Sequence, residues 1–320
     1  IHWRDWSSDV CSSDLVCFSF PSSSSARIFS ALPAPSSADR GATLACCARL
    51  ESDVTIEAEI DEEPDAESIP VKDFSGTVSR IETLTPTIKG LFFTLNEPLH
   101  FQAGQYVNLD IPTLGISRAF SLANVPSTGR EVELNVRIVP GGAGTGYLHE
   151  RLAVGDPIRL SGPYGRFFVR KSAKVPLIFM AGGSGLSSPR SMILDLLAEG
   201  CTLPITLVYG QRRREELYYH DDFVDLAARF PNFTYVPALS DEPADSDWAG
   251  HRGFVHEAAK AHFDNDFRGH KAYLCGPPAM IDACISTLMQ GRLFENDIYT
   301  EKFFSAADAQ QVRSPLFRRV

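Results

Sequence analysis

The hydrophobic periodicity of the sequence changes near residue 173, and this change constrains the fold more than any other feature. Between residues 74 and 169, short segments alternate apolar and polar side chains, most regularly over residues 131–138. Glycine-rich turns at residues 140–146 and 162–166 interrupt these segments. Short alternating segments separated by turns predict an antiparallel barrel or sandwich.

Beyond residue 173, expected strands alternate with expected helices. A buried strand is predicted at residues 175–180, then a helix with Ser188 as its N-cap and Pro189 at its first position. Further elements follow in order: strand 205–209, helix 215–229, strand 234–238, helix 255–263, strand 272–275 and helix 278–290. This alternation predicts a parallel sheet with ligands at the carboxyl ends of its strands. The predicted fold class is therefore β followed by α/β.

Length and charge narrow the classes of function. A chain of 320 residues has room for two domains, and its formal net charge is −10. Residues 51–67 hold nine acidic and no basic side chains, so the remaining residues carry a charge of about −1. We interpret this run as a solvated linker, with a docking surface for a basic partner as the alternative. No basic face suggests nucleic-acid binding, and no apolar run is long enough for a membrane span.

Seven cysteines are present, at positions 11, 17, 46, 47, 201, 275 and 284. Their odd number and irregular spacing argue against a secreted disulfide framework and predict a cytoplasmic protein. Residues 1–15 lack any regular period and resemble a translated adaptor sequence, so they are expected not to be native. The following residues are rich in Ser, Pro and Ala, and the leader 1–41 is predicted to be disordered or non-native.

Two segments of the first half suit a phosphate-bearing ligand with a flat ring. Arg118-Ala119-Phe120-Ser121 offers a guanidinium for phosphate, an aromatic side chain, and a hydroxyl for a ring nitrogen such as flavin N5. A strand with one surface arginine is the alternative. Gly144-Thr145 precedes a short helix expected at residues 147–152, whose free N–H groups suit a pyrophosphate, although a plain tight turn competes.

Two segments of the second half suit a second nucleotide. Gly182-Gly183-Ser184-Gly185 lies between the predicted buried strand and the capped helix, a position that strengthens an otherwise weak glycine motif. Cys275-Gly276-Pro277, continuing to Met280, ends a late strand, and a buried structural cysteine is the alternative there. Together the segments predict two ligand sites that meet between two domains.

These segments resemble motifs of the ferredoxin–NADP reductase superfamily. Residues 118–121 are similar to its Arg-x-Tyr/Phe-Ser signature, residues 155–167 to Gly-Asp-x-Ile-x-Leu-x-Gly-Pro-Tyr-Gly-x-Phe, and residues 275–280 to Cys-Gly-Pro-x-x-Met. The resemblance implies a six-stranded antiparallel FAD-binding barrel over 72–172, a Rossmann-like NAD(P)-binding domain over 173–309, and a tail over 310–320. Phe120 stands where many members have tyrosine.

The resemblance also implies site residues. The closing segment 299–304 resembles the part of the family that covers the flavin, so Glu301 and Phe303 become candidates, with core packing as the alternative for Phe303. The expected catalytic residues are Ser121, Cys275 and Glu301. The expected cofactor-binding residues are Arg118, Ala119, Phe120, Ser121, Arg137, Ile138, Gly144, Thr145, Gly182, Gly183, Ser184, Gly185, Arg212, Cys275, Gly276, Pro277 and Phe303.

The identity of the nicotinamide depends on residues 212–214, which are three consecutive arginines. They could hold the 2′-phosphate of NADPH, or they could be a solvated loop at the start of a helix. Similarity to one subfamily of this superfamily implies NADH as the electron donor. We expect NADH, with NADPH as the alternative.

Residues 42–60 resemble the end of a plant-type [2Fe–2S] ferredoxin domain. Cys46 matches its fourth cluster ligand, and Val54, Ile56 and Ala58 alternate as in a strand. The C-x4-C-x2-C loop that would supply the other three ligands is missing upstream. We therefore expect residues 42–71 to be a remnant of that domain with its acidic linker, and Cys46 to be an orphan ligand without a cluster.

Three details resemble the reductase components of multicomponent phenol hydroxylases: a glycine segment one residue longer than usual, residues 43–47 and residues 218–221. This similarity implies a monomeric reductase that passes electrons from NADH through FAD to an oxygenase component in aromatic hydrocarbon catabolism. The alternatives are a reductase of a methane/toluene-type monooxygenase or a ring-hydroxylating dioxygenase, and a non-catalytic flavin-binding electron-transfer subunit.

Overall fold

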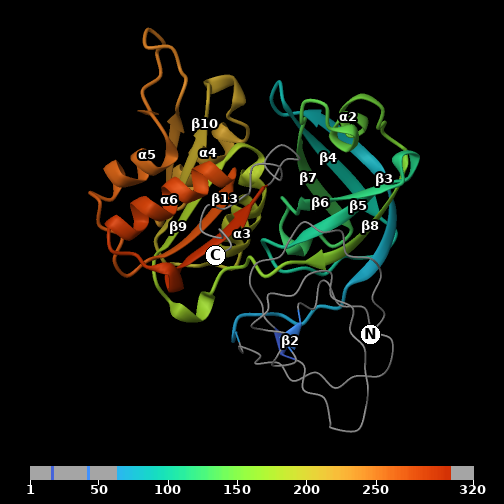
Figure 1. The fold of residues 1–320 in the computed structure, drawn as a ribbon, viewed down its shortest axis with the longest axis horizontal. Helices are drawn as coiled ribbons and strands as arrows, with labels where there is room; N and C mark the ends of the chain where they lie inside the picture. The colour runs from blue at the N-terminus through green and yellow to red at the C-terminus, as the bar shows by residue number, and fades with distance from the viewer. Residues whose placement is uncertain (1–15, 18–41, 44–62, 304–320) are drawn as a thin grey trace, which may run out of the picture. The chain divides into compact units, whose positions relative to one another are not determined.

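The computed structural model describes residues 16–17, 42–43 and 63–303 (Figure 1). The chain divides into two units, Ile1–Pro64 and Asp65–Val320. In the first unit, strands β1 (Val16–Cys17) and β2 (Ala42–Thr43) pair antiparallel. The strand expected at 54–58 and the orphan ligand Cys46 lie outside the described residues.

The second unit begins with a six-stranded antiparallel sheet, as the alternating segments predict. Its strand order is β6-β5-β8-β3-β4-β7, and a bridge between Leu122 and Leu134 brings its two ends together. Inward side chains such as Leu91, Phe93 and Leu109 are at most 1% exposed, so the sheet encloses its own core. The strands are β3 (Lys72–Thr83), β4 (Ile88–Leu95), β5 (Tyr106–Ile111), β6 (Ile116–Ser121), β7 (Glu131–Arg137) and β8 (Pro157–Tyr164).

Helix α2 (Ala143–Glu150) connects β7 to β8, and it corrects the helix expected at residues 147–152. It begins four residues earlier because the extended Gly142 already accepts a hydrogen bond from the N–H of Gly146 at 2.9 Å. Glycines have low helix propensity, which is why the pattern placed them before the helix. Gly144 and Thr145 therefore lie within the first helical turn.

The remainder of the second unit is built on a six-stranded parallel sheet, again as predicted. Its order is β12-β11-β10-β9-β13-β14, so the order reverses beside β9. Ligands of such sheets bind at the carboxyl ends of the strands next to this reversal. The strands are β9 (Leu177–Gly182), β10 (Ile205–Gln211), β11 (Phe233–Leu239), β12 (His251–Arg252), β13 (Lys271–Gly276) and β14 (Ile298–Lys302).

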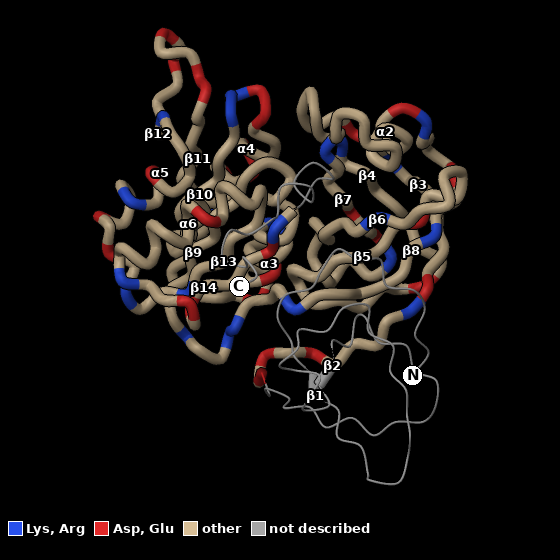
Figure 2. The backbone as a smooth tube through the Cα atoms, in the orientation of Figure 1, with Lys and Arg blue, Asp and Glu red and all other residues tan. Residues whose placement is uncertain are grey.

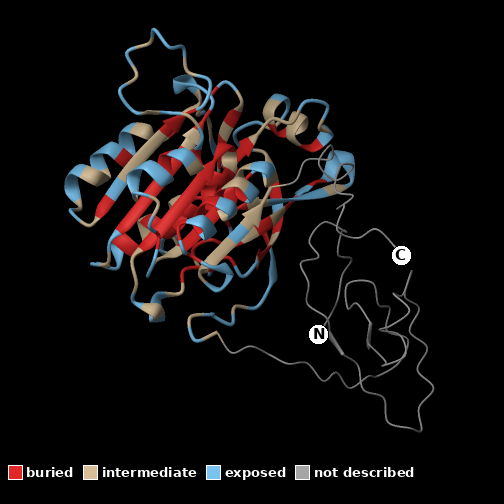
Figure 3. Cartoon of the chain, turned by 60° about the vertical axis from the view of Figure 1, so that its left-hand side comes forward, coloured by how far each residue is buried: buried red, intermediate tan, exposed pale blue. Residues whose placement is uncertain are grey.

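Helices cover both faces of this sheet, and Figure 3 shows the strands buried between them. Phe179 and Leu177 of β9 pack in one core with α3 (Ser187–Ala198) and α4 (His220–Arg229). Their neighbours Ile178 and Met180 pack in a second core with α5 (Val255–His262) and α6 (Pro278–Gln290). Burial on both faces explains why β9 is a continuous apolar run.

Two helix starts differ from the sequence prediction. Ser188 does not cap a helix, because α3 continues from a 3-10 turn at Gly183–Leu186 and Ser188 is already its second residue. Helix α4 begins at His220 instead of residue 215, because Tyr219 has a φ of 56°, in the left-handed region that a helix cannot include. Residues Arg214–Glu216 form a separate 3-10 turn.

The barrel and the parallel sheet share apolar packing. Phe167, which follows β8, belongs to the same core as Phe179 and contacts Tyr273 of β13 edge-on, with ring centroids 6.1 Å apart. The seam between the two sheets is thus a packed interface where side chains from both can meet. Within the described part of the chain, no helix has the length and apolarity needed to cross a membrane.

Candidate active site

The glycine loop, residues 182–185, and the Cys275 segment touch each other backbone to backbone. They leave the carboxyl ends of the neighbouring strands β9 and β13. A Cβ atom on Gly185 would lie 2.4 Å from the carbonyl oxygen of Cys275, closer than real atoms approach. Gly276 has a φ of 151°, and a Cβ there would lie 3.0 Å from the carbonyl oxygen of Gly182. Glycine is therefore required where the two motifs cross.

The carboxylate of Glu301 collects three hydrogen bonds from three different segments. Its Oε2 accepts from Ser188 Oγ at 2.7 Å, from Ser121 Oγ at 3.2 Å and from Cys275 Sγ at 3.5 Å. Glu301 on β14 is the register partner of Cys275 on β13, while Ser121 ends β6 of the barrel. The three residues expected to be catalytic thus lie together, and Ser188 joins them; we call these four residues the Glu301 cluster.

Burial dominates the electrostatics of this cluster. It raises the pKa of Glu301, while the bonds from Ser188, Cys275 and Ser121 oppose the rise without cancelling it. Burial, and then the charge of Glu301, raise the pKa of the Cys275 thiol well above its ordinary value. Cys275 is therefore a neutral, polarizable group and not a thiolate nucleophile. The cluster can position a reacting atom and hold a proton, which suits positioning catalysis.

Arg118 of β6 lies beside the first turn of α2. Arg118 is exposed, and its Cγ lies 3.4 Å from the position that a Cβ on Gly144 would occupy. The N–H groups of the first turn of α2 have no acceptor within the helix. Thr145 Oγ1 accepts from the N–H of Val139 at 3.1 Å and fixes the turn. A guanidinium beside free amides suits a phosphate group.

The remaining predicted residues of the barrel side lie near this site or near the glycine loop. Arg137 ends β7, and its Nη1 lies 3.1 Å from where a Cβ on Gly183 would be. Ile138 donates its N–H to Thr87 O at 2.8 Å, which fixes the chain after β7. Ala119 is exposed, and the half-buried Phe120 packs against the barrel core.

Arg212 lies in a loop where three consecutive arginines pair with two carboxylates. Arg212 Nη2 and Arg213 Nε each lie 3.5 Å from Asp241 Oδ2, and Arg214 Nη1 lies 2.9 Å from Asp247 Oδ1. Figure 2 shows the acidic residues along the loop between β11 and β12. A 2′-phosphate at these arginines would therefore meet carboxylates.

The other candidates surround the crossing of the two motifs. Phe303 is half-buried against the apolar core and donates its N–H to Gly276 O at 3.0 Å. Ser184 is half-buried, and Pro277 is exposed immediately before α6. The described residues contain no group of three metal-ligating side chains, while Cys46 lies outside them.

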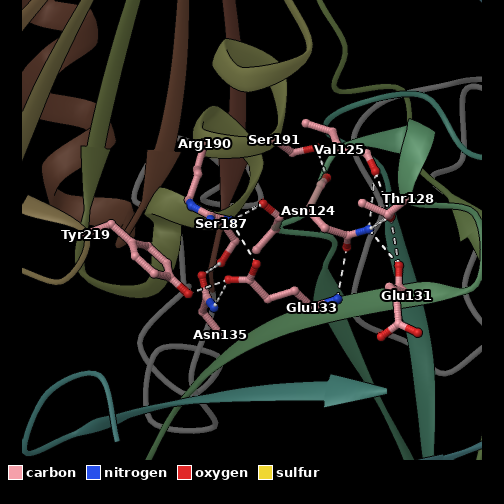
Figure 4. Close-up of polar contacts among 11 residues, drawn as sticks. Asn124, Val125, Thr128, Glu131, Glu133, Asn135, Ser187, Arg190, Ser191 and Tyr219 are labelled. Carbon is pink, nitrogen blue, oxygen red and sulfur yellow. Dashed lines mark hydrogen bonds and ion pairs between the residues drawn. The ribbon is translucent and has the colours of Figure 1, made fainter. Parts of the chain in front are cut away.

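A second carboxylate at the seam, Glu133, is absent from the sequence prediction. Glu133 of β7 is 6% exposed, and its Oε2 accepts from Arg190 Nη1 at 2.8 Å (Figure 4). Its Oε1 accepts from Tyr219 Oη at 2.5 Å and from Asn135 Nδ2 at 3.0 Å. We call these four residues the Glu133 cluster. The alternating pattern places Glu133 on the same polar face as Glu131, which is exposed, so nothing local distinguishes them.

Helix α3 carries most of the remaining contacts to the barrel. Arg190 Nη1 also donates to Ala123 O at 2.6 Å, and Ser191 Oγ donates to Asn124 O at 2.6 Å. Ser187 Oγ lies 3.4 Å from Asn135 Oδ1. One face of α3 is therefore bound to the barrel while Ser188, in the same first turn, is bound to Glu301.

Two family models match the chain, one over the barrel and one over the parallel-sheet part. The oxidoreductase FAD-binding domain model matches residues 75–169, and the oxidoreductase NAD-binding domain model matches residues 179–285. The first range contains Arg118 and Gly144, and the second contains the glycine loop and Cys275. FAD and NAD are thus the cofactors of the two parts.

Several relatives are reductases of oxygenase systems. The chain is 60% identical over 284 residues to the reductase component of phenol 2-monooxygenase from Pseudomonas sp. (strain CF600), covering 88% of this chain and 80% of the relative. It is 54% identical over 284 residues to the phenol hydroxylase P5 protein of Acinetobacter pittii (strain PHEA-2), with the same coverage.

The solved structure of Amycolatopsis cytochrome P450 reductase superposes with a TM-score of 0.78 at 33% identity, covering 87% of this chain and 85% of that one. The fold, both domain models and the relatives agree. The chain belongs to the ferredoxin–NADP reductase-type family of FAD- and NAD-binding proteins and is an NAD(P)H-dependent flavin oxidoreductase.

Proposed function

We propose that this protein passes electrons from NADH through FAD to the oxygenase component of a multicomponent aromatic-ring monooxygenase such as phenol hydroxylase. The observation that carries the proposal is the convergence of Ser121, Ser188 and Cys275 on Glu301, because it joins the FAD-binding and NAD-binding parts at one point. The 60% identity to a phenol 2-monooxygenase reductase component supports the choice of oxygenase.

The residues of the barrel fit FAD. Arg118 and the first turn of α2 would hold its pyrophosphate, since they offer a guanidinium and free N–H groups beside Gly144. With FAD bound, the single O–H of Ser121 would donate to the flavin ring in place of Glu301 Oε2, and Phe120 would pack beside the ring. In the same way, the glycine loop and Arg137 would hold the pyrophosphate of NADH.

When bound, the two cofactors supply the redox chemistry, in which FAD accepts a hydride from NADH and releases the electron pair singly. The protein side chains supply position. Cys275 would contact the nicotinamide ring as a neutral thiol, and Glu301 would hold Ser188 and Cys275 in one arrangement beside Ser121. Phe303, bonded to Gly276, would lie over the flavin face that the nicotinamide takes.

The charges around Arg212 support NADH over NADPH. Asp241 and Asp247 pair with the three arginines and place carboxylates where a 2′-phosphate would enter. We expect NADH to reduce the protein at lower concentration than NADPH. Replacing Asp241 with alanine should narrow that difference, and an unchanged preference would count against this assignment.

The upstream residues belong to the same proposal. We propose that residues 42–71 are a remnant of a [2Fe–2S] ferredoxin domain, that 72–172 and 173–309 are the two cofactor-binding domains, and that Cys46 is an orphan ligand. Similarity of residues 42–60 to the end of a plant-type ferredoxin supports this division. Iron and acid-labile sulfide analysis of the purified protein tests it, since a stoichiometric cluster would contradict the ligand count.

Anaerobic titration of the FAD-loaded protein tests the proposed function most directly. We expect NADH to bleach the flavin absorbance stoichiometrically and NADPH to do so less effectively. A flavin that stays oxidised with both nucleotides would overturn the enzyme assignment and favour a flavin-binding electron-transfer subunit.

Acceptor assays test the partner. With phenol hydroxylase oxygenase, the reduced protein should support turnover. Faster turnover with a methane/toluene-type monooxygenase or a ring-hydroxylating dioxygenase would redirect the assignment to that system. Dioxygenase reductase components also occur among the relatives, at 34% identity.

A further inference from the structure

Two consecutive tyrosines, Tyr218 and Tyr219, lie between the glycine loop and the barrel, and the hydride chemistry does not use either of them. Tyr219 has a φ of 56°, a backbone conformation that non-glycine residues rarely adopt. Such a conformation persists when surrounding contacts hold it in place. The contacts of the Tyr218 and Tyr219 side chains therefore show which parts of the protein this backbone conformation connects.

Tyr219 is held by the barrel. Its hydroxyl donates to Glu133 Oε1 at 2.5 Å, and the guanidinium of Arg190 lies 4.1 Å from its ring centroid (Figure 4). Glu133 belongs to β7 of the barrel, whereas Tyr219 directly precedes α4 of the parallel-sheet part. A hydrogen bond to a buried carboxylate is among the stronger kinds, so this contact is an anchor between the two parts.

Tyr218 is held by the glycine loop. It is 2% exposed, and its hydroxyl donates to the carbonyl oxygen of Gly183 at 3.3 Å. Gln211 Nε2 approaches the same carbonyl oxygen at 3.5 Å. In a trans peptide the C=O and the following N–H point in opposite directions. Fixing the Gly183 carbonyl toward Tyr218 therefore directs the N–H of Ser184 away from it.

We propose that Tyr219 is a positioning residue for hydride transfer. Its bond to Glu133 fixes the Tyr218–Tyr219 backbone, and Tyr218 in turn fixes the Gly183 carbonyl and thus the Ser184 N–H, which would bind a nucleotide phosphate. The pair sets the nucleotide loop at a defined place relative to the barrel. This inference rests on the proposed function, because it concerns the alignment of nicotinamide with flavin.

The substitution Tyr219→Phe tests the anchor, because it removes one hydroxyl and keeps the ring under Arg190. In the full-length, FAD-loaded protein, we expect the limiting rate of flavin reduction by NADH to fall about tenfold, the usual range for a lost bond to a charged group. The FAD content should stay unchanged.

Tyr235→Phe is the matched control. It removes a hydroxyl that contacts His220 Nδ1 at 3.1 Å within the parallel-sheet part, away from the barrel. We expect its limiting rate to stay within about twofold of the wild-type rate, because this hydroxyl bonds to His220 and not to Glu133 or to the Gly183 carbonyl oxygen. An equal loss in both variants, accompanied by equal loss of thermal stability, would show a merely structural role and overturn the proposal.

Two readouts do not depend on turnover. Hydrogen–deuterium exchange of the amides of residues 183–188 should accelerate in Tyr219→Phe and not in Tyr235→Phe. Calorimetric titration with ADP-ribose, which has the pyrophosphate but no nicotinamide, should show about tenfold weaker binding in Tyr218→Phe, because its Ser184 N–H is no longer oriented. Wild-type exchange and wild-type ADP-ribose affinity in these variants would overturn the proposal.

These readouts also separate the inference from the proposed function. If NADH fails to reduce the wild-type flavin, the proposed function is wrong, and exchange and ADP-ribose binding still decide whether the tyrosines set the loop. If NADH reduces wild type and Tyr219→Phe at one rate, only the inference is wrong. Should Tyr219→Phe fold poorly, Glu133→Gln removes the same charged acceptor and must reproduce the slower reduction and faster exchange.

Discussion

Two carboxylates lie at the seam between the barrel and the parallel sheet, the buried Glu133 and the half-buried Glu301, and their hydrogen-bond partners differ in kind. Glu133 faces a cation, Arg190, together with Tyr219 and Asn135. Among the described residues, the hydrogen-bond donors to Glu301 are all neutral, and burial raises its pKa. A buried carboxylate with a cation is suited to hold structure, because its charge is compensated. A carboxylate whose hydrogen-bond donors are all neutral can bind a proton, and its hydrogen bonds to those donors can then break.

Neighbouring residues of helix α3 contact these two different carboxylates. Arg190 and Ser188 are two residues apart in α3, yet one binds the compensated carboxylate and the other binds the uncompensated one. The Glu133 cluster is therefore an anchor that holds the seam together. The neighbouring Glu301 cluster, which we call the responsive site, can gain a proton and release its donors. Substitutions at each carboxylate should show this difference in stability, in rate and in pH dependence.

The largest effect is expected from removing the cation at the anchor. Arg190→Ala leaves the Glu133 carboxylate buried without its counter-charge, which should lower the free energy of unfolding by about 3–5 kcal/mol. Denaturant unfolding measures this. Lys171→Ala is the control, since Lys171 pairs with Glu199 at 2.6 Å on the surface and should lose about 0.2–1 kcal/mol. Equal small losses would show that Glu133 is not an anchor.

The second effect concerns rate at the responsive site. Ser121→Ala should slow flavin reduction by NADH about a hundredfold, because a donor at the reacting centre is lost. The free energy of unfolding should change by only about 1 kcal/mol. Ser117→Ala, on the same strand, removes a bond to Leu109 O at 3.3 Å and should reduce at the wild-type rate. Equal rates for both variants would remove Ser121 from the proposed site.

A third, smaller effect depends on pH. Because the pKa of Glu301 is raised in the folded protein, its burial penalises the ionised form, and stability falls as pH rises from about 4.5 through the raised pKa. Glu301→Gln should therefore be more stable than wild type at pH 8, as measured by denaturant unfolding. The gain should shrink toward pH 4.5.

The exposed Glu131 provides the control for this experiment. Glu131→Gln should show no such pH-dependent gain, because solvent screens that carboxylate. A stability difference for Glu301→Gln that grows as pH falls would contradict the sign of the argument.

The smallest effect concerns the pKa itself. Ser188 is the shortest donor to Glu301, so Ser188→Ala should raise the pKa of Glu301 further. Infrared titration of the carboxyl band would follow it. Ser191→Ala removes a bond to Asn124 O from the same helix and should leave the midpoint where it is in wild type. A midpoint that moves downward in Ser188→Ala would show that this hydroxyl does not stabilise the ionised form.

The sequence predicts an element correctly where the hydrophobic pattern within that element determines its limits. Helix α6 has the predicted limits, 278–290, because Pro278 starts it and an apolar face repeats through it. The start of α4 was not accessible, because the left-handed conformation of Tyr219 depends on Glu133, 86 residues away in the sequence. The pattern alone suggested a helix from residue 215.

The candidate site likewise contains residues that the sequence predicts and residues that only the folded structure identifies. Ser121, Cys275 and Glu301 lie in motifs that resemble a known family, and the structure brings them together. Glu133 and Arg190 lie in no such motif, and only the closure of the seam distinguishes the buried Glu133 from the exposed Glu131. Long-range burial decides these roles, and a local pattern cannot express it.

Strand β14, which carries Glu301, is the outermost strand of its sheet and pairs only with β13. An edge strand is the part of a sheet that can detach without disrupting the rest. Detachment of β14 would disengage Ser121, Ser188 and Cys275 at once, while the Glu133 anchor kept the two cofactor-binding parts joined.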